Sequence, residues 1–436
     1  MIANGCECEP LVFSDRHLLA RHACEIAAGL ELAMQTTGAG RGILAFVNGA
    51  PALEEAVRAA VKSSRIEIFQ SPEFYPAMLE PLLTYEATGR VVPSAGSPES
   101  VGVLVLNVET LFNLSLAMAG RPVTHRSVTV AGEVAEPKVV RLPLGAPLSD
   151  AIQCAGGATI ERYRVLVGGP ISGRLADATT EPITKTTSAV IVLPMQHIQV
   201  QKRMRSLSMM LLRARSVCFE CQDCTESCPL HLLGQAIEPH KIMRAISHSL
   251  DSLNTSITSA VNCGECGVCE SFVCKMGISP RLICHEIKAH LAAMGWEKAS
   301  DVRTARVLEN WEEKRIPIDA LVERLGVAKY FRALDIPKLL ETGGEQQDET
   351  FGNLMIPLLQ HIGVPALPVV HSGDAVQAGQ MIGEIPDGKL AARVHTGLSG
   401  TVGSVGTCSV EINGSPESAA QLNAQPGASY VNLPSC

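Results

Sequence analysis

Apolar positions in the first part of the chain alternate between short continuous runs and segments of helical spacing. GILAFVNGA at 42–50 is a β-rich run, and PALEEAVRAAVKS at 51–63 repeats its apolar residues at the helical period, with Pro51 in the first turn. RIEIF and VGVLVLNV supply two more strands, and the second leads into the helical segment ETLFNLSLAMAG. This strand–helix–strand rhythm over residues 1–120 predicts a parallel sheet.

The rhythm changes along the rest of the chain. Residues 121–195 contain short strands, turns and one helix from about Pro147, which predicts a small mixed α+β module. Residues 196–340 have helical patterns, and the polar, glycine-bearing segment ETGGEQQDETFG at 341–352 is typical of a linker. The tail at 353–436 is β-rich with regular glycines. We therefore expect a multidomain protein that combines α/β and α+β parts.

Length and composition agree with this picture. A chain of 436 residues can form two to four domains with proper cores. Hydrophobic residues make up 46% but aromatic residues only 4%, which favours the Ala, Val, Leu and Ile cores of α/β layers over an aromatic-rich β-sandwich. The net charge of −8 and the pI near 5.9 argue against nucleic acid as the main partner.

The expected cellular compartment rests on two features, the start of the chain and its longest apolar stretch. The start MIANGCECEP has neither the basic region nor the apolar region of a secretory signal. The longest apolar stretch, at 101–120, is interrupted by Asn107, Glu109 and Asn113, so it predicts a strand and a helix and no membrane span. We expect a cytoplasmic protein, in which clustered cysteines bind metal or perform redox chemistry more often than they form disulfides.

Two dense cysteine runs lie within the helical region. CFECQDCTESCP gives the spacing C-x2-C-x2-C-x3-C-P from Cys218 to Pro229, and CGECGVCESFVC gives C-x2-C-x2-C-x4-C from Cys263 to Cys274. A disulfide framework is unusual in a reducing compartment, and x2 spacings give poor bridge geometry. Zinc needs paired C-x2-C knuckles, so the third close cysteine of each run is surplus. The first spacing is that of bacterial two-cluster ferredoxins and favours two [4Fe–4S] clusters.

The spacing also predicts a crossed arrangement of ligands. Three cysteines at x2 spacing wrap one cluster, and the fourth cysteine of each run ligates the other cluster. The x4 gap before Cys274 and the absence of a following proline depart from the usual pattern. The predicted ligands are Cys218, Cys221, Cys224 and Cys274 for one cluster, and Cys263, Cys266, Cys269 and Cys228 for the other. Cys24, Cys154, Cys284 and Cys408 lie in apolar stretches and are expected to be inert core thiols.

Several stretches match a known family in order. The chain resembles the family that contains the NADH-oxidising subunit of respiratory complex I, the RnfC component of the Rnf electron-transport complex, and the cobalamin reductase of propanediol utilisation. The resemblance covers nearly the whole chain and continues through both cysteine runs, with HLLGQAIEPHKIMRA between them. The stretches that carry it are NGCECEP…SDR, YP with Glu80, TGRVVP, VGVLVLNVETL, RSVTVAGEVAEPKVVRLPLGAPLSDAIQCAGG, RVLVGGPISG and TKTTSAVIVLP.

This resemblance gives each segment an expected identity. It implies an N-terminally incomplete flavin/NADH-type α/β domain at 1–120, a soluble-ligand-binding (SLBB) β-grasp module at 121–195, and an α-helical two-cluster domain at 196–340. The linker follows, and VVHSGDAVQAGQMIGEI…VHTGLSGTV in the tail resembles a lipoyl-like barrel-sandwich hybrid domain, without a lysine at its hairpin. In the Rnf component this domain precedes the flavin domain, whereas in cobalamin reductase it follows the clusters, as it does here.

The family's flavin contacts fall on seven residues of this chain. The resemblance implies that acidic side chains meet the ribityl group or the nicotinamide side, and that Asn107 and Thr110, at a strand-to-helix turn, meet the phosphate. The residues so implied are Asn4, Glu7, Glu9, Tyr75, Glu80, Asn107 and Thr110. Two features depart from the family pattern. The glycine-rich loop expected before NGCECEP is not present in a sequence that starts at Met1, and Met78 and Leu79 stand where the family has glycine.

The resemblance implies an NADH-dependent oxidoreductase. It would pass electrons through FMN and two [4Fe–4S] clusters to a corrinoid or a corrinoid-handling protein. Two alternatives stay open: a flavin-free electron relay or docking subunit, which the missing glycine loop favours, and an Rnf-type subunit of a membrane-attached ferredoxin:NAD oxidoreductase. The implied location is the cytoplasm, within a bacterial microcompartment or peripheral to a membrane through partner proteins.

Overall fold

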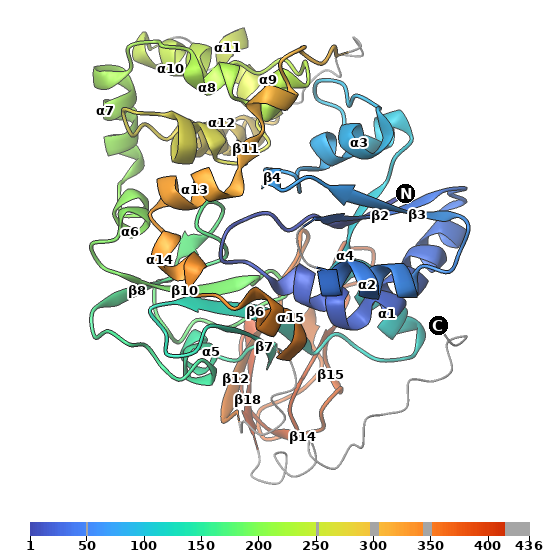
Figure 1. Ribbon diagram of the computed structural model, residues 1–436. Coiled ribbons are helices and arrows are strands. Elements are labelled where there is room, and N and C mark those ends of the chain that lie inside the picture. Colours follow the sequence, from blue (N-terminus) through green and yellow to red (C-terminus); the bar gives the residue numbers. More distant parts are fainter. Residues whose placement is uncertain (49–50, 250–252, 297–304, 343–350, 415–436) are drawn as a thin grey trace.

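The computed structural model describes residues 1–48, 51–249, 253–296, 305–342 and 351–414. Its N-terminal part is a four-stranded sheet in the order β3-β2-β1-β5, with all strands parallel (Figure 1). The predicted parallel sheet is confirmed. Its strands are β1 (Ile2–Gly5), β2 (Gly42–Val47), β3 (Ile66–Ser71) and β5 (Val105–Asn107).

Helices α1 (Ser14–Thr37), α2 (Pro51–Ala60) and α4 (Val108–Met118) pack against this sheet. Burial of leucine and isoleucine side chains from α1 supplies about 1.5–3 kcal/mol each. At Gly29, a Cβ atom would lie 2.0 Å from the carbonyl oxygen of Leu111, so glycine permits α1 and α4 to approach closely. The predicted strand at 101–108 is shorter than expected, because a 3₁₀ turn at Pro98–Val101 and Gly102 at φ +73° precede it.

The order of the strands defines a crevice. From β1 the chain passes through α1 to β2 on one side, and it later returns to place β5 on the other side. The carboxyl ends of β1 and β5 therefore flank a topological switch point, where ligands bind in open α/β sheets. Asn4 and Asn107 are paired in register across these two strands at that edge.

A second sheet of five strands has the order β7-β6-β10-β8-β9. β6 pairs in parallel with β10, and the other neighbours are antiparallel, as expected for a mixed module. The helix predicted from about Pro147 is α5 (Leu148–Cys154). The strands are β6 (His125–Gly132), β7 (Lys138–Pro143), β8 (Tyr163–Val167), β9 (Arg174–Leu175) and β10 (Ala189–Pro194).

The helical region lies at one end of the molecule (Figure 1). After this region the chain returns to the N-terminal part. There β11 (Ile316–Pro317) pairs with β4 (Phe74–Tyr75) in a separate two-stranded sheet, and α15 (Ile336–Thr342) contacts α1. No helix among the described residues is long and apolar enough to cross a membrane. The other helices are α3 (Glu80–Thr88), α6 (Ile198–Arg203), α7 (Leu207–Val217), α8 (Asp223–Glu226), α9 (Pro229–Leu232), α10 (Pro239–Ser247), α11 (Thr255–Thr258), α12 (Pro280–Ala293), α13 (Ile318–Leu325) and α14 (Ala328–Arg332).

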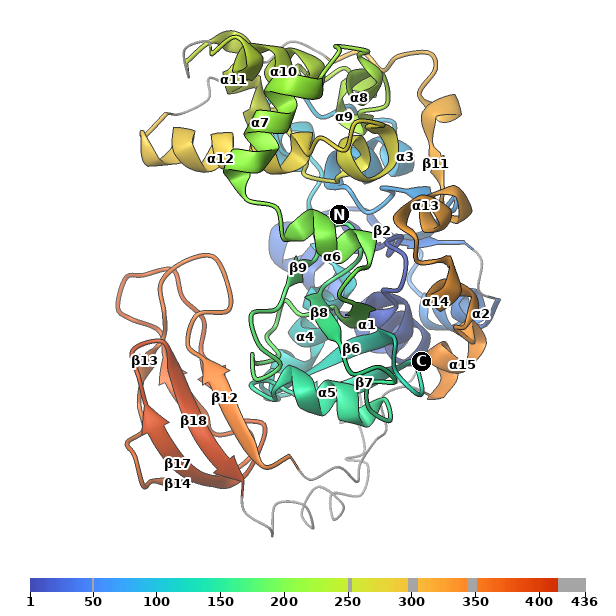
Figure 2. The same ribbon diagram turned by 90° about the vertical axis from the view of Figure 1, so that its left-hand side faces the viewer.

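The β-rich tail forms two small sheets beside the second sheet and away from the helical region (Figure 2). Its core is continuous with that of the mixed module, and the amide of Met355 donates to the carbonyl of Gly145 at 2.9 Å. Most of the predicted linker lies outside the described residues. The strands are β12 (Asn353–Pro357), β13 (Leu367–Pro368), β14 (Ala375–Val376), β15 (Met381–Glu384), β16 (Val394–His395), β17 (Gly400–Val405) and β18 (Ser409–Gly414).

Candidate functional site: two cysteine-lined cavities and a sheet edge

The first cavity lies between the end of α7 and the start of α12. Its apolar walls include Met243, Met276 and Ile278. The loop between α7 and α8 curls around it through two residues in the left-handed region, Glu220 at φ +57° and Gln222 at φ +68°. The four cysteines that line it, here called the first cysteine group, are Cys218, Cys221, Cys224 and Cys274.

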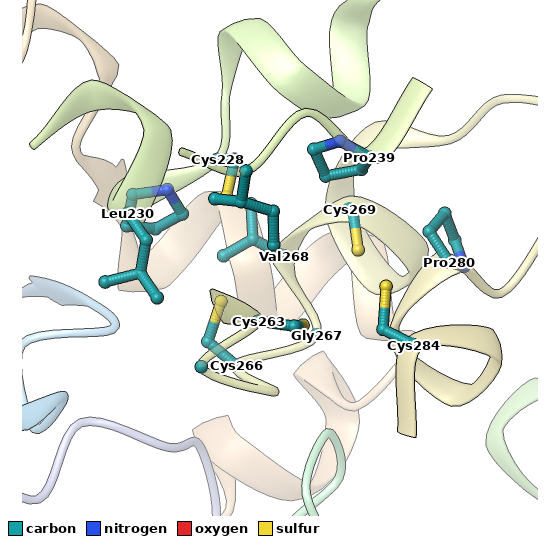
Figure 3. A pocket seen from close by; sticks show the side chains of 13 residues that line it. Cys228, Leu230, Pro239, Cys263, Cys266, Gly267, Val268, Cys269, Pro280 and Cys284 are labelled. Carbon is teal, nitrogen blue, oxygen red and sulfur yellow. The ribbon is translucent and has the colours of Figure 1, made fainter. Parts of the chain in front are cut away.

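The second cavity lies between α9 and α12 (Figure 3). The loop before Cys269 turns through Glu265 at φ +56° and Gly267 at φ +72°. Leu230, Ile237 and Val268 give this cavity apolar walls, and Pro280 lines both cavities. Its lining includes the four cysteines here called the second cysteine group, Cys228, Cys263, Cys266 and Cys269.

The structure therefore brings the cysteines together in the crossed grouping that the spacing predicts. Cys228, from the first run, joins the cysteines of the second run, and Cys274, from the second run, joins those of the first. Pro229 begins α9 directly after Cys228, so that helix leads the chain away from the cavity. That these eight thiols ligate iron stays a prediction.

The donor sets fit two iron–sulfur clusters. Burial first, with the charge of neighbouring cysteines after it, raises the pKa of Cys224 and of Cys228 to about 12. Buried thiolates this close together need a bound cation to offset their repulsion and desolvation, and the irons of a cluster supply it. No three Cys, His, Asp or Glu side chains among the described residues are arranged to hold a single metal ion. Each cysteine group instead lines a cavity.

The expectation of four buried core thiols outside the two cysteine groups holds only in part. Cys154 is buried, as predicted for a core thiol, but Cys24 is only half-buried and Cys408 is exposed. Cys284 is buried, yet the prediction that it is an inert core thiol misses its position, because it lines the second cavity. A helix that begins at Pro280 places residue 284 one turn later on the same face, and that spacing was the available signal. Cys436 lies outside the described residues.

At the sheet edge, Asn107 and Thr110 stand at the start of α4. The side chain of Asn107 accepts a hydrogen bond from the Glu109 amide at 2.8 Å, and its amide group donates to Asp15 at 2.7 Å. Thr110 is exposed in the first turn. Exposed polar groups at a helix N-terminus are typical of phosphate sites.

The carboxylate of Glu7 is hydrogen-bonded to the start of α1. Its carboxylate accepts hydrogen bonds from the Ser14 hydroxyl at 2.9 Å and from the amides of Asp15 and Arg16 at 3.1 Å. It thus satisfies free amides at the start of α1. Burial, together with the charge of Asp15, raises the pKa of Glu7 to about 7.

Glu9 fastens the N-terminal segment to the second sheet. Its carboxylate accepts from the amides of Ile171 and Ser172 at 2.5 and 2.8 Å, and from the Ser172 hydroxyl at 2.6 Å. These residues belong to the VGGPISG turn between β8 and β9. A Cβ at Gly169 would lie 2.1 Å from the Glu9 carboxyl carbon, so only glycine admits the carboxylate. Nothing in the sequence spacing indicated this contact between distant segments.

Tyr75 and Glu80 belong to the segment that runs from β4 into α3. Tyr75 is buried, and its hydroxyl donates to the carbonyl of Cys266 at 2.5 Å. Glu80 is exposed at the start of α3, and partial burial followed by the charge of Glu99 raises its pKa. Of the seven implied flavin residues, Tyr75 therefore contacts the loop of the second cysteine run, and Glu80 stands at the start of α3.

Met78 and Leu79 fill the space beyond β1. The Asn4 amide group donates to the Met78 carbonyl at 3.0 Å, and the Cys8 thiol lies 3.3 Å from the Met78 sulfur. A Cβ at Gly264, in the second cysteine run, would lie 3.0 Å from the Leu79 side chain. The β1 side of the edge is thus occupied by protein, whereas the α4 side is open.

Four family models match successive parts of the chain. They are a Nuo51 FMN-binding domain at residues 1–116, an SLBB domain at 127–175, a 4Fe-4S dicluster domain at 217–279, and an RnfC barrel sandwich hybrid domain at 346–420. The chain thus combines an FMN-binding domain with a 4Fe-4S dicluster domain.

Individual relatives cover half of the chain or more. It is 34% identical to the cobalamin reductase PduS of Salmonella typhimurium, over 93% of this chain and 87% of that protein. It is 35% identical to PduS of Citrobacter freundii, over 94% of this chain and 89% of that protein. A relative from Acetobacterium woodii, the C component of the Na(+)-translocating ferredoxin:NAD(+) oxidoreductase complex, is 32% identical, over 53% of this chain and 50% of that protein.

Proposed function

The chain belongs to the cobalamin reductase family, and from that membership we propose that it is an oxidoreductase that passes electrons from NADH to a corrinoid. FMN and two [4Fe–4S] clusters are its cofactors in this proposal. A flavin accepts a hydride pair and releases single electrons, which iron–sulfur clusters carry. The observation that carries the proposal is the crossed grouping of eight cysteines beside an FMN-type domain.

The two cysteine groups differ in their surroundings. The loop of the second group contacts the FMN-type domain through Tyr75 and Leu79, and Ile171 packs against its Gly267. The loop of the first group faces outward, since Cys221 is exposed and Phe219 is 63% exposed. We therefore propose that the second group lies on the flavin side and the first group on the side of the acceptor.

The open end of the sheet edge is the proposed phosphate site. Asn107 and Thr110 would hold the FMN phosphate at the start of α4, since both are polar and exposed there. For Glu7 and Glu9 we propose structural roles, because their oxygens already accept hydrogen bonds from α1 and from the turn between β8 and β9. In this assignment, neither carboxylate binds the flavin directly.

The proposed acceptor is a corrinoid or a corrinoid-handling protein, as the names of the relatives suggest. We propose a cytoplasmic location, within a bacterial microcompartment. Co-purification with an adenosyl- or hydroxocorrinoid enzyme from such a compartment would support this, and purification with membrane subunits would instead favour the Rnf-type alternative.

A second candidate is an iron–sulfur relay that binds no flavin. The specific observation in its favour is that the Asn4 amide is already bonded to the Met78 carbonyl. The same segment contacts the second cysteine run through Leu79. In this candidate, a separate reductase would supply the electrons.

The test is acid release of cofactors from anaerobically purified protein, with flavin fluorescence measured beside iron and sulfide. About one FMN with about eight irons supports the reductase, if NADH then bleaches the cluster absorbance. About eight irons without flavin, even after incubation with FMN, would support the relay. The variant Thr110→Val, in the first turn of α4, should weaken FMN binding. The control variant Thr36→Val, near the C-terminal end of α1, should not.

A further inference from the structure

The second cavity contains one cysteine more than a four-iron cluster uses. Besides the second cysteine group, Cys284 of α12 lines it. Figure 3 shows the sulfur atoms of Cys284 and Cys269 directed toward each other across the cavity. The fifth thiol therefore belongs to this site and not to a separate hydrophobic core.

The helix fixes the position of Cys284. α12 begins at Pro280, which lines both cavities, and Cys284 follows one turn later on the same face. Cys284 is 1% exposed, as is its neighbour Ile283. A side chain packed this tightly on a helix cannot turn toward solvent, so its thiol stays beside the second cysteine group.

The sulfurs of the second cysteine group surround this thiol, and the sulfur of Cys269 faces it most directly (Figure 3). At the edge of the same site, the Glu265 amide donates to the Cys263 sulfur at 3.4 Å. Lys288, one turn beyond Cys284, donates to the Cys263 carbonyl at 2.6 Å. Cys263 thus lies among donors, which is the surrounding that a ligating thiolate favours.

A hydrogen bond to a ligating thiolate changes the cluster that the thiolate holds. It withdraws negative charge from the sulfur, which stabilises the reduced cluster more than the oxidised one. The reduction potential therefore rises. A thiol is a weak donor, but in a buried site its effect is less screened than in water.

We propose that Cys284 is a positioning residue that donates its thiol hydrogen to a sulfur of the second cysteine group and raises the reduction potential of the cluster held by that group. It is not a fifth ligand. This inference rests on the two-cluster function proposed above. It adds a means by which the two clusters are held at different potentials.

The test compares Cys284→Ala, which removes the donor, with Cys284→Ser, which keeps one in a side chain of nearly the same size. Cys154→Ala is the matched control, because Cys154 is a buried thiol in α5 of the second sheet module. Each holoprotein is purified anaerobically and assayed for iron and sulfide. Both clusters are then titrated potentiometrically with detection by electron paramagnetic resonance.

We expect about eight irons in every variant, and one of the two midpoint potentials shifted to more negative values in Cys284→Ala only. Loss of half the iron in Cys284→Ala would overturn the proposal, since Cys284 would then be a ligand. Unchanged potentials, or equal shifts in the Ala and Ser variants, would also overturn it. A wild-type protein without about eight irons would instead contradict the proposed function.

Discussion

The hydroxyl of Tyr75 donates a hydrogen bond to the backbone carbonyl of Cys266 at 2.5 Å. The two residues are 191 positions apart, and the bond joins the FMN-type domain to the loop of the second cysteine group. Tyr75 is 1% exposed, so this bond is shielded from water. One phenol therefore joins β4 to the loop of the second cysteine group.

Removing this hydroxyl should loosen the junction between the domains. In Tyr75→Phe the Cys266 carbonyl loses a buried donor, so we expect the free energy of unfolding to fall by about 1–2 kcal/mol. Iron content should stay near eight, because no thiol changes, while cluster reduction by NADH should slow. Denaturant unfolding and stopped-flow bleaching measure the two effects, with Tyr163→Phe in β8 as the control. An unchanged rate would argue against a role for this contact in electron transfer.

A variant of Glu9 can distinguish a structural role of its carboxylate from a role as a flavin ligand. In Glu9→Ala the amides of Ile171 and Ser172 lose a charged acceptor, and we expect the free energy of unfolding to fall by about 2 kcal/mol. FMN affinity should change little. Thermal unfolding and fluorescence titration with FMN separate the two readouts. A protein of normal stability that no longer binds FMN would show that Glu9 is a flavin ligand and that its structural role was assigned wrongly.

The crossed grouping predicts which cysteine variants behave alike. Cys228→Ala and Cys266→Ala should each lose about four of eight irons and should abolish the same resonance signal, although the two residues lie in different runs. Cys218→Ala should abolish the other signal. Cys154→Ala should retain both. If Cys228→Ala abolished the signal that Cys218→Ala abolishes, each run would hold its own cluster.

His17 should make stability depend on pH. Its Nδ1 lies 3.0 Å from the Leu339 carbonyl, and burial lowers its pKa from 6.5 to about 4. Between these values the unfolded chain binds the proton more readily, so the free energy of unfolding should fall as the pH drops from 6.5 toward 4, by about 3 kcal/mol at most. His17→Asn keeps a donor near Leu339 but does not titrate. Its stability should fall less over the same range, as measured by urea unfolding at each pH.

Much of the architecture could be predicted from periodicity. The strand at 42–47 and the helix at 51–60 follow local rules of spacing and first-turn proline, and the structure has both. The crossed grouping of Cys228 and Cys274 also follows from local spacing, because three thiols in a tight loop leave the fourth out of reach. The family membership was confirmed as well.

The remainder depends on contacts between distant segments. Nothing near Glu9 indicates that its partners lie at Ile171 and Ser172. The spacing from Pro280 to Cys284 puts both on one helix face, but the sequence does not show that Pro280 lines a cavity. Glu7 was implied as a flavin residue by resemblance, whereas its hydrogen bonds depend on the angle at which α1 leaves β1. Such angles are set by packing, which local patterns do not encode.

The barrel-sandwich tail meets the mixed module through its own first strand. The amide of Met355 bonds to the carbonyl of Gly145, and a Cβ at Gly145 would lie 2.7 Å from the Ile356 side chain. Backbone pairing and close packing at Gly145 therefore fix the position of the tail on the mixed module. A domain held in this way carries its docking surface within its own first strand.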